Sequence, residues 1–394
     1  ADLMTLVIHH PRVRIAEKQT FVVRGEADQR LLYPNPRIGI EAEELSDHDL
    51  SRTDSTSRVK ISQPVIVGPR RRTGNQLKQA EIAGSYFETI RTIHDLLGQV
   101  APIYLRLVLN ADELTLLSSL EADMLALLER QKTRSEAGAA AELDTALIRV
   151  EYDLLLQERD ELLRAQQQLI NHLRRLTGFY DLTYDKLDLA YSESDVMGPH
   201  SELVEQLLAT HPHLIQVRAK RDIVVEKISH EKALNVPDVE VEIAYARNHG
   251  SDENLVELGL SMPLNLFDRR QGSLAAYQSQ LAANDELIHA VEWDLRADLE
   301  DAHSRYVSYK STLKRLDNQT IPLSKETYRQ AFDRFQAGKI SVFELINTIQ
   351  SHHQVVNHRL QIEFQLNQAI SSLQLLTASP AVKLYESKGT TGDE

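Results

Sequence analysis

The chain has 394 residues, of which 42% are hydrophobic and 26% are charged, a composition typical of folded proteins. Its formal net charge of −14 argues against a general nucleic-acid binder, because such proteins present a basic face to the phosphate backbone. It contains no cysteine, which excludes disulfides, thiolate catalysis and thiolate metal sites. No stretch reaches the roughly eighteen uncharged apolar residues of a membrane-spanning helix, so any membrane role would fall to strands.

The sequence contains an internal repeat, with matching segments about 200 residues apart. The matches are His10-Pro11 with His211-Pro212, "SQPVIVG" (62–68) with "SMPLNLF" (261–267), and "EAGAAAELD" (136–144) with "QAGKISVFE" (336–344). An ordered series at nearly constant offset indicates a duplication. Each copy predicts a helix that starts at its proline, a β hairpin, a very long helix, a glycine turn and a return helix.

The two copies are expected to contain the same elements at corresponding positions. Repeat 1 (1–190) is expected to hold a hairpin at 34–68 and long helices at 72–133 and 141–178. Repeat 2 (200–378) is expected to hold a hairpin at 236–267 and long helices at 271–334 and 341–377. Residues 179–200 are interpreted as a linker and 379–394 as a flexible tail. Pro322 is expected to bend or interrupt its helix, whereas the helix at 72–133 is expected to be free of such a break.

The hairpins alternate between apolar and polar residues. Val239, Val241, Ile243 and Tyr245 are expected on one face of a strand, with polar or small residues on the other. Four strands with open edges cannot cross a membrane alone, since each unpaired backbone group in lipid costs several kcal/mol and the smallest bacterial barrels have about eight strands. Either several chains pool their strands, three chains giving twelve, or the strands form a small sheet in a soluble coiled-coil scaffold or adaptor protein.

The chain resembles the TolC-like outer membrane efflux proteins from His10 to about Thr377. The resemblance rests on the duplicated order of elements, on "HPRV" and "HPHL", on "SQPVIVGPRR" and "SMPLNLFDRR", and on "FQAGKISVFELINT" (335–348). Within the family the chain is most similar to the heavy-metal branch, which is CzcC- and CusC-like. The fold class expected is mainly α with one β hairpin per repeat.

This resemblance implies a homotrimer in the outer membrane of a Gram-negative bacterium, with a large periplasmic portion. Twelve strands would close a β-barrel in outer membrane lipid, and the long helices would form a hollow periplasmic α-barrel. The implied role is a passive export duct for heavy-metal cations, coupled by a periplasmic adaptor protein to an inner-membrane RND-type pump. The resemblance implies neither an enzyme nor a cofactor, and no nucleic acid as a partner.

The resemblance also assigns roles to the two glycine turns. The implied periplasmic tips, which would dock the adaptor, are Ala137-Gly138 and Ala337-Gly338 with Ser341. The alternative is that each is an ordinary helix–helix turn, for which glycine is also suited. A larger set of positions corresponds to the closed periplasmic gate of the family: Glu344, Asn347, Asp144 and Lys339. Three Glu344 side chains around an axis would attract cations, the alternative being a solvated glutamate. Ile340 occupies the position of an arginine that pairs with the acid at 144 in the family, which leaves Lys339 as a substitute partner.

Fifteen histidines raise the question of a metal site. Adjacent histidines on a helix, such as His352 and His353, diverge by about 100° and do not converge on one ion, so no metal site is expected. His10 and His211 are instead expected to cap or pack beside their prolines. The basic runs at 69–72 and 268–270 are expected to lie at a membrane interface or to be solvated, and Tyr33, Tyr245 and Phe267 to join an aromatic girdle.

Overall fold

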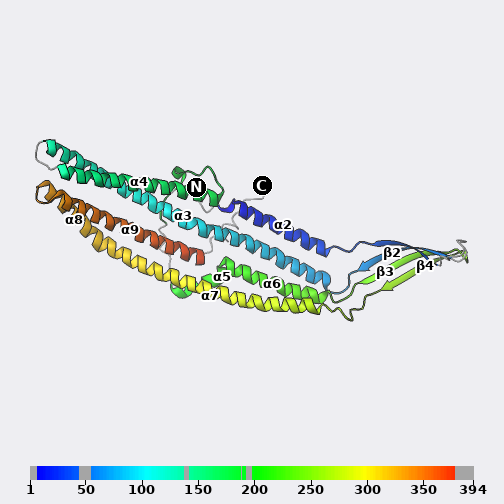
Figure 1. Cartoon of the computed structure of the whole chain (residues 1–394). Helices are drawn as coiled ribbons and strands as arrows, with labels where there is room; N and C mark the ends of the chain where they lie inside the picture. Colours follow the sequence, from blue (N-terminus) through cyan, green and yellow to red (C-terminus); the bar gives the residue numbers. More distant parts are fainter. Residues whose placement is uncertain (1–6, 44–54, 137–141, 188, 192–197, 378–394) are drawn as a thin grey trace. The chain divides into compact units, whose positions relative to one another are not determined.

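The computed structural model describes residues 7–43, 55–136, 142–187, 189–191 and 198–377, shown in Figure 1. The chain forms two compact units. The first consists of residues 1–15, 90–214 and 291–394, and the second of residues 16–89 and 215–290. Each unit therefore combines segments from both copies of the sequence repeat. The predicted tail at 379–394 and the turn at Ala137-Gly138 lie outside the described residues.

The second unit contains one antiparallel sheet in the order β1-β2-β3-β4 (Figure 1). Its strands are β1 (Arg37–Glu43), β2 (Thr56–Val65), β3 (Val239–Asn248) and β4 (Glu253–Ser261). Both hairpins form, and β2 pairs with β3, so the two copies join through opposed residues such as Ile61 and Ile243. Within the described residues β1 and β4 pair on one side only, which leaves each an open edge. The strands β2 and β4 end earlier than the expected hairpin limits of 68 and 267.

The described helices include α5 (His200–Thr210), which was not expected, because the first helix of repeat 2 was predicted to start at Pro212. Their bounds are α2 Pro11–Leu31, α3 Arg70–Glu136, α4 Glu142–Thr177, α5 His200–Thr210, α6 Pro212–Ala233, α7 Gln271–Arg315, α8 Ile321–Gln336 and α9 Val342–Thr377, with a short 3-10 turn at Tyr184–Lys186. Proline is the first residue of α2 and of α6, where its missing N–H costs no helical hydrogen bond. None of the described helices combines the length and apolarity needed to cross a membrane.

Two prolines lie along the long helices. Pro102 lies inside α3, where no proline was expected, and the helix runs through it for 67 residues in all. Pro322 lies in the first turn of α8, directly after a π-helical turn at Leu316–Thr320. In this turn the N–H of Ile321 donates to the carbonyl of Leu316, five residues back. A wider turn of this kind accommodates the missing donor of the proline, so the expected interruption takes the form of a π-bulge.

One part of the core of the first unit lies near the glycine turn that joins α8 to α9, two helices that run side by side (Figure 1). Buried residues of α3, α4, α8 and α9 meet there: Met124, Leu127, Ile148, Ala331, Phe335, Val342, Leu345, Ile346 and Ile349. A smaller cluster joins Leu105 and Leu109 of α3 to Phe364 of α9. The long helices are therefore held together by side chains that are far apart in the sequence.

Candidate functional site

Apolar side chains cover one face of the sheet in rows that cross all four strands. The two central rows are Ile38, Ile61, Ile243 and Leu258, then Ile40, Val59, Tyr245 and Val256. All eight side chains are exposed, with between 49% and 80% of their surface accessible. A contiguous apolar surface is unusual on a protein in water and marks an interaction surface. The predicted alternation is therefore present, and its apolar face is open in the single chain.

The opposite face of the sheet carries a network of ion pairs centred on β2. Arg58 lies 2.8 Å from Glu257 of β4 and 2.8 Å from Glu43 of β1, measured between nitrogen and carboxylate oxygen. Lys60 pairs with Glu41 in the same way. Ala244 and Ala246, the cross-strand neighbours of Lys60 and Arg58, are almost fully covered although they lie on this polar face. The alternation of the sequence predicted two faces, but only the strand register reveals this network.

The basic runs at the strand–helix junctions have specific partners. Arg70 forms an ion pair of 2.6 Å with Asp238, and the Arg71 guanidinium lies 4.7 Å from the centre of the Tyr33 ring. Arg270 pairs with Glu231 at 2.9 Å. Arg70 and Arg71 therefore join the start of α3 to residues shortly before β3 and β1, and Arg270 joins the residue before α7 to α6. A position at the membrane interface and a part in an aromatic girdle stay predictions for these junctions.

The turn after α8 is closed by a Schellman motif. Gly338 has a φ of +68°, in the left-handed region that favours glycine. Its N–H donates to the carbonyl of Phe335 at 3.0 Å, and the N–H of Lys339 donates to the carbonyl of Arg334 at 2.9 Å. The backbone conformation of this turn thus favours glycine at position 338, independent of any partner.

The start of α9 is fixed by a capping box between Ser341 and Glu344. The N–H of Glu344 donates to the hydroxyl of Ser341 at 3.2 Å, and the N–H of Ser341 donates to the Glu344 carboxylate at 2.8 Å. Two hydrogen bonds from Ser341 lower the pKa of Glu344, because they favour the charged carboxylate. The bond from the backbone N–H has the larger effect, and the bond from the hydroxyl has the smaller one. This capping role was not predicted, although the spacing Ser-x-x-Glu just before a hydrophobic run is the sequence pattern of a capping box.

The other candidate gate positions are Asn347, Asp144 and Lys339, with Ile340 beside Lys339. Asn347 is exposed and lies three residues after Glu344 in α9. Ile340 packs against the large core, which gives this position a hydrophobic role in place of the arginine expected from the resemblance. Asp144 lies in the first turn of α4, and no ion pair joins it to Lys339 among the residues that the structure describes.

The buried histidines serve local structure. The Nδ1 atom of His10 accepts the N–H of Arg12 at 3.1 Å, which is the capping role expected beside Pro11. The ring of His211 lies 4.9 Å from that of His94, whose Nε2 is 3.1 Å from the Leu375 carbonyl oxygen. Burial lowers the pKa of His211 to about 3. Within the described ranges, no group of three or more potential ligands converges on a metal ion.

Comparison with solved structures identifies the architecture. The outer-membrane channel OprN matches with a TM-score of 0.74 at 15% identity, over 95% of this chain and 88% of that chain. CusC, described in connection with transmembrane channel formation, matches with a TM-score of 0.76 at 13% identity, over 95% and 91% respectively. At these identities the likeness concerns the fold alone. The chain has the mainly helical fold, with one small sheet, of TolC-like channels.

Comparison of sequences finds similarity to outer membrane efflux proteins. Residues 203–379 match the family described as "Outer membrane efflux protein". Over 365 residues the chain is 24% identical to the cobalt-zinc-cadmium resistance protein CzcC of Cupriavidus metallidurans, covering 91% of this chain and 84% of that protein. Residues 203–379 are thus similar to outer membrane efflux proteins, and most of the chain is similar to CzcC. Proteins of this family are transport components and not enzymes.

Proposed function

We propose that this protein is the outer membrane channel component of a tripartite efflux system, a passive duct from the periplasm to the exterior. The observation that carries the proposal is the two-faced sheet with open edges. Its apolar face suits lipid, and its ion-paired face suits a water-filled interior, as in membrane barrels whose strands alternate in this way. A soluble scaffold, the alternative, would need another element to cover the apolar face.

The open edges favour assembly from several chains, and the resemblance to TolC-like channels implies that there are three. In lipid each unpaired backbone group costs several kcal/mol, so β1 and β4 would have to find partners before the sheet entered a membrane. One chain supplies four strands, and a homotrimer supplies the twelve of a closed barrel in outer membrane lipid. In this arrangement β1 of each protomer pairs with β4 of the next.

The helix α4 supports contact between neighbouring chains. Leu143, Val150 and Leu154 are spaced by seven and four residues, which is the spacing of a coiled-coil seam. These three side chains are exposed in the single chain, between 51% and 69%. A helix of a neighbouring protomer would cover them, and such contacts repeated around an axis would build a hollow periplasmic α-barrel.

The helix turns are proposed to serve docking and gating. Ala137-Gly138 and Ala337-Gly338, with Ser341, would contact a periplasmic adaptor. Glu344 and Asn347 would line the periplasmic gate, with the Glu344 carboxylate held at the start of α9 by its capping box. Because Lys339 and Asp144 form no ion pair within the described part of one chain, we propose their contact between neighbouring chains.

Heavy-metal cations are the proposed cargo. CzcC is a cobalt-zinc-cadmium resistance protein, and a duct with a ring of three Glu344 carboxylates would attract cations. An RND-type inner-membrane pump, joined through the adaptor, would supply the energy and select the substrate. The protein would then lie in the outer membrane, with its long helices in the periplasm.

Fractionation of a Gram-negative host tests the proposed location. The chain is expressed behind an export signal, and membranes are separated on a density gradient and washed with alkaline carbonate. We expect the protein in the outer membrane fraction, released only by detergent. Recovery in the soluble periplasmic fraction, with native helicity by circular dichroism, would contradict the proposal and favour the scaffold.

A further inference from the structure

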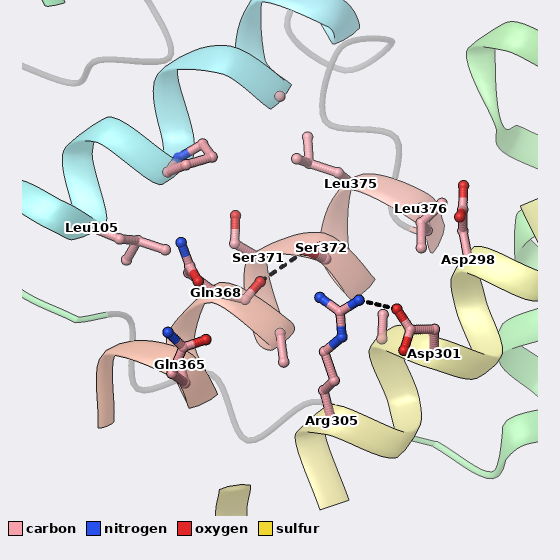
Figure 2. Close-up of a pocket in the computed structure, with 14 residues that line it drawn as sticks. Leu105, Asp298, Asp301, Arg305, Gln365, Gln368, Ser371, Ser372, Leu375 and Leu376 are labelled. Atoms are coloured by element: carbon pink, nitrogen blue, oxygen red, sulfur yellow. Dashed lines mark hydrogen bonds and ion pairs between the residues drawn. The ribbon is translucent and has the colours of Figure 1, made fainter. Parts of the chain in front are cut away.

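A pocket of about 450 Å³ lies in the first unit between α3, α7 and α9 (Figure 2). Its volume is within the range of about 300–1,000 Å³ that small-molecule sites occupy. Figure 2 shows Asp298 and Asp301 on the α7 side, and Gln365 and Gln368 on the α9 side. Leu105 of α3 and Leu375 of α9 add apolar surface. The pocket therefore combines a carboxylate wall, amide groups and an apolar portion.

The α3 wall contains the two residues that are least favourable inside a helix. Glycine costs about 1 kcal/mol relative to alanine there, and proline about 3 kcal/mol. Gly98 and Pro102 are one turn apart, and both line the pocket. Because Pro102 has no N–H, the carbonyl of Gly98 lacks its regular partner four residues later. Gly98, a residue of the pocket wall, therefore carries a carbonyl that lacks its regular helical partner.

Close packing does not explain the glycine. A Cβ atom at Gly98 would meet no other atom within 4 Å, apart from the backbone of its own helix, so a methyl group here would find open space. The missing side chain keeps the pocket open on the α3 side. Departures from good local sequence choices are expected at functional sites, where another requirement outweighs stability.

The charges of the α7 wall favour a cation. Arg305 pairs with Asp301 on the next turn of the helix, so these two charges cancel (Figure 2). Asp298 has no ion-pair or hydrogen-bond partner in the part of the chain that the structure describes, and it leaves the pocket with one uncompensated negative charge. The Asp298 carboxylate and the Gly98 carbonyl are both acceptors, and they belong to different helices.

We propose that this pocket binds small organic cations, namely protonated amines that carry an apolar body. The ammonium group would donate to the Asp298 carboxylate, with the Gly98 carbonyl and the pocket amides as further acceptors, and the apolar body would contact Leu105 and Leu375. The site is separate from the helix turns proposed as gate and docking tips. The inference does not depend on the proposed duct function, because it concerns one chain and needs neither an open gate nor a pump.

Calorimetric titration of the full-length, detergent-solubilised protein with phenethylammonium chloride tests the charge requirement. We expect saturable binding that Asp298→Asn weakens about ten-fold. Asp294→Asn is the matched control, because Asp294 is an exposed aspartate of the same helix that does not line the pocket; it is expected to bind as the unchanged protein does. The uncharged analogue 2-phenylethanol is expected to bind at least ten-fold more weakly.

A second variant tests the location. Gly98→Leu fills the pocket from α3 and improves local helix propensity, so it is expected to fold and to lose measurable binding. Gly25→Leu in α2 is its control, since a Cβ at Gly25 likewise meets nothing within 4 Å. Absence of saturable binding, equal binding of the alcohol, or unchanged binding by Asp298→Asn or Gly98→Leu would each overturn the proposal. The first of these outcomes would point to a neighbouring chain that occupies the pocket.

Discussion

Ser341 and Glu344 hold each other at the first turn of α9, where the Ser341 N–H donates to the Glu344 carboxylate at 2.8 Å. The return bond, from the Glu344 N–H to the Ser341 hydroxyl, measures 3.2 Å. Together they satisfy backbone donors that the helix itself leaves free. The same carboxylate is the one proposed to attract cations at the gate, so its structural and functional roles have to be separated by experiment.

Substitutions at the two positions separate these roles. Glutamine also supports a capping box, so Glu344→Gln is expected to keep thermal stability and to lower cation selectivity in planar bilayers. Ser341→Ala removes the cap and is expected to lower the free energy of unfolding by about 1 kcal/mol, with cation selectivity retained. Equal selectivity of Glu344→Gln and the unchanged protein would rule out the carboxylate as a gate residue.

The burial of His211 predicts a pH dependence of stability. Its pKa is lowered from 6.5 to about 3, so the unfolded chain binds a proton more readily than the folded one. Stability is therefore highest above about pH 6.5 and falls as the pH decreases towards 3. We expect Tm to decrease from pH 7 to pH 5, and His211→Gln to reduce this decrease.

This test has a control at His9, and a second buried histidine, His10, contributes to the same pH dependence. His9 is exposed, so His9→Gln is expected to leave the pH dependence of Tm unchanged. Burial also lowers the pKa of His10, so part of the decrease should persist in His211→Gln. If Tm of His211→Gln decreased as much between pH 7 and pH 5 as that of the unchanged protein, the account of His211 as a buried neutral imidazole would be wrong.

The apolar face of the sheet is expected to tolerate charge only near its ends. Leu258 lies mid-strand and is 80% exposed, so Leu258→Lys should reduce assembly in the outer membrane, a lysine at mid-bilayer costing about 2–4 kcal/mol. Asn254 lies on the same face near the β3–β4 turn, where the cost falls to about 0–1 kcal/mol, so Asn254→Lys should assemble. Density-gradient fractionation measures both. Similar yields for the two variants would contradict a lipid-facing surface.

The seam on α4 is expected to join neighbouring chains. Leu154→Glu places a charge within it and should lower the fraction of trimer in detergent, measured by light scattering. Leu163 is an exposed leucine on the opposite side of α4, at about 100° per residue, so Leu163→Glu is the matched control. Loss of trimer in the control alone would move the proposed interface to the other side of the helix.

Local patterns predicted much of the fold. The alternation of 239–245 and the position of Pro11 and Pro212 specify strands and helix starts through period and backbone chemistry alone. The break near Pro322 was expected from the backbone chemistry of proline. Its form, a π-helical turn, could not be predicted, because it depends on which carbonyl accepts each backbone N–H near the proline. Pro102 was overlooked, and α3 shows that neighbouring contacts can hold a long helix together across a proline.

Local patterns could not predict contacts between residues that are far apart in the sequence. The ring contact between His94 and His211, and the ion pair between Arg58 and Glu257, join residues far apart in the sequence, so they depend on the register and packing of whole elements. Ile340 was noted as a departure from an expected arginine, and only the packed core gives it a role. The capping box at Ser341, by contrast, was readable from four residues.

The mass of the detergent-solubilised protein by native mass spectrometry tests the central claim most directly, with an aqueous sample measured beside it. The account predicts a trimer that requires detergent, because the open edges of β1 and β4 and the apolar face of the sheet need neighbouring chains and a lipid-like environment. A monomer or dimer that stays folded in water without detergent would contradict it.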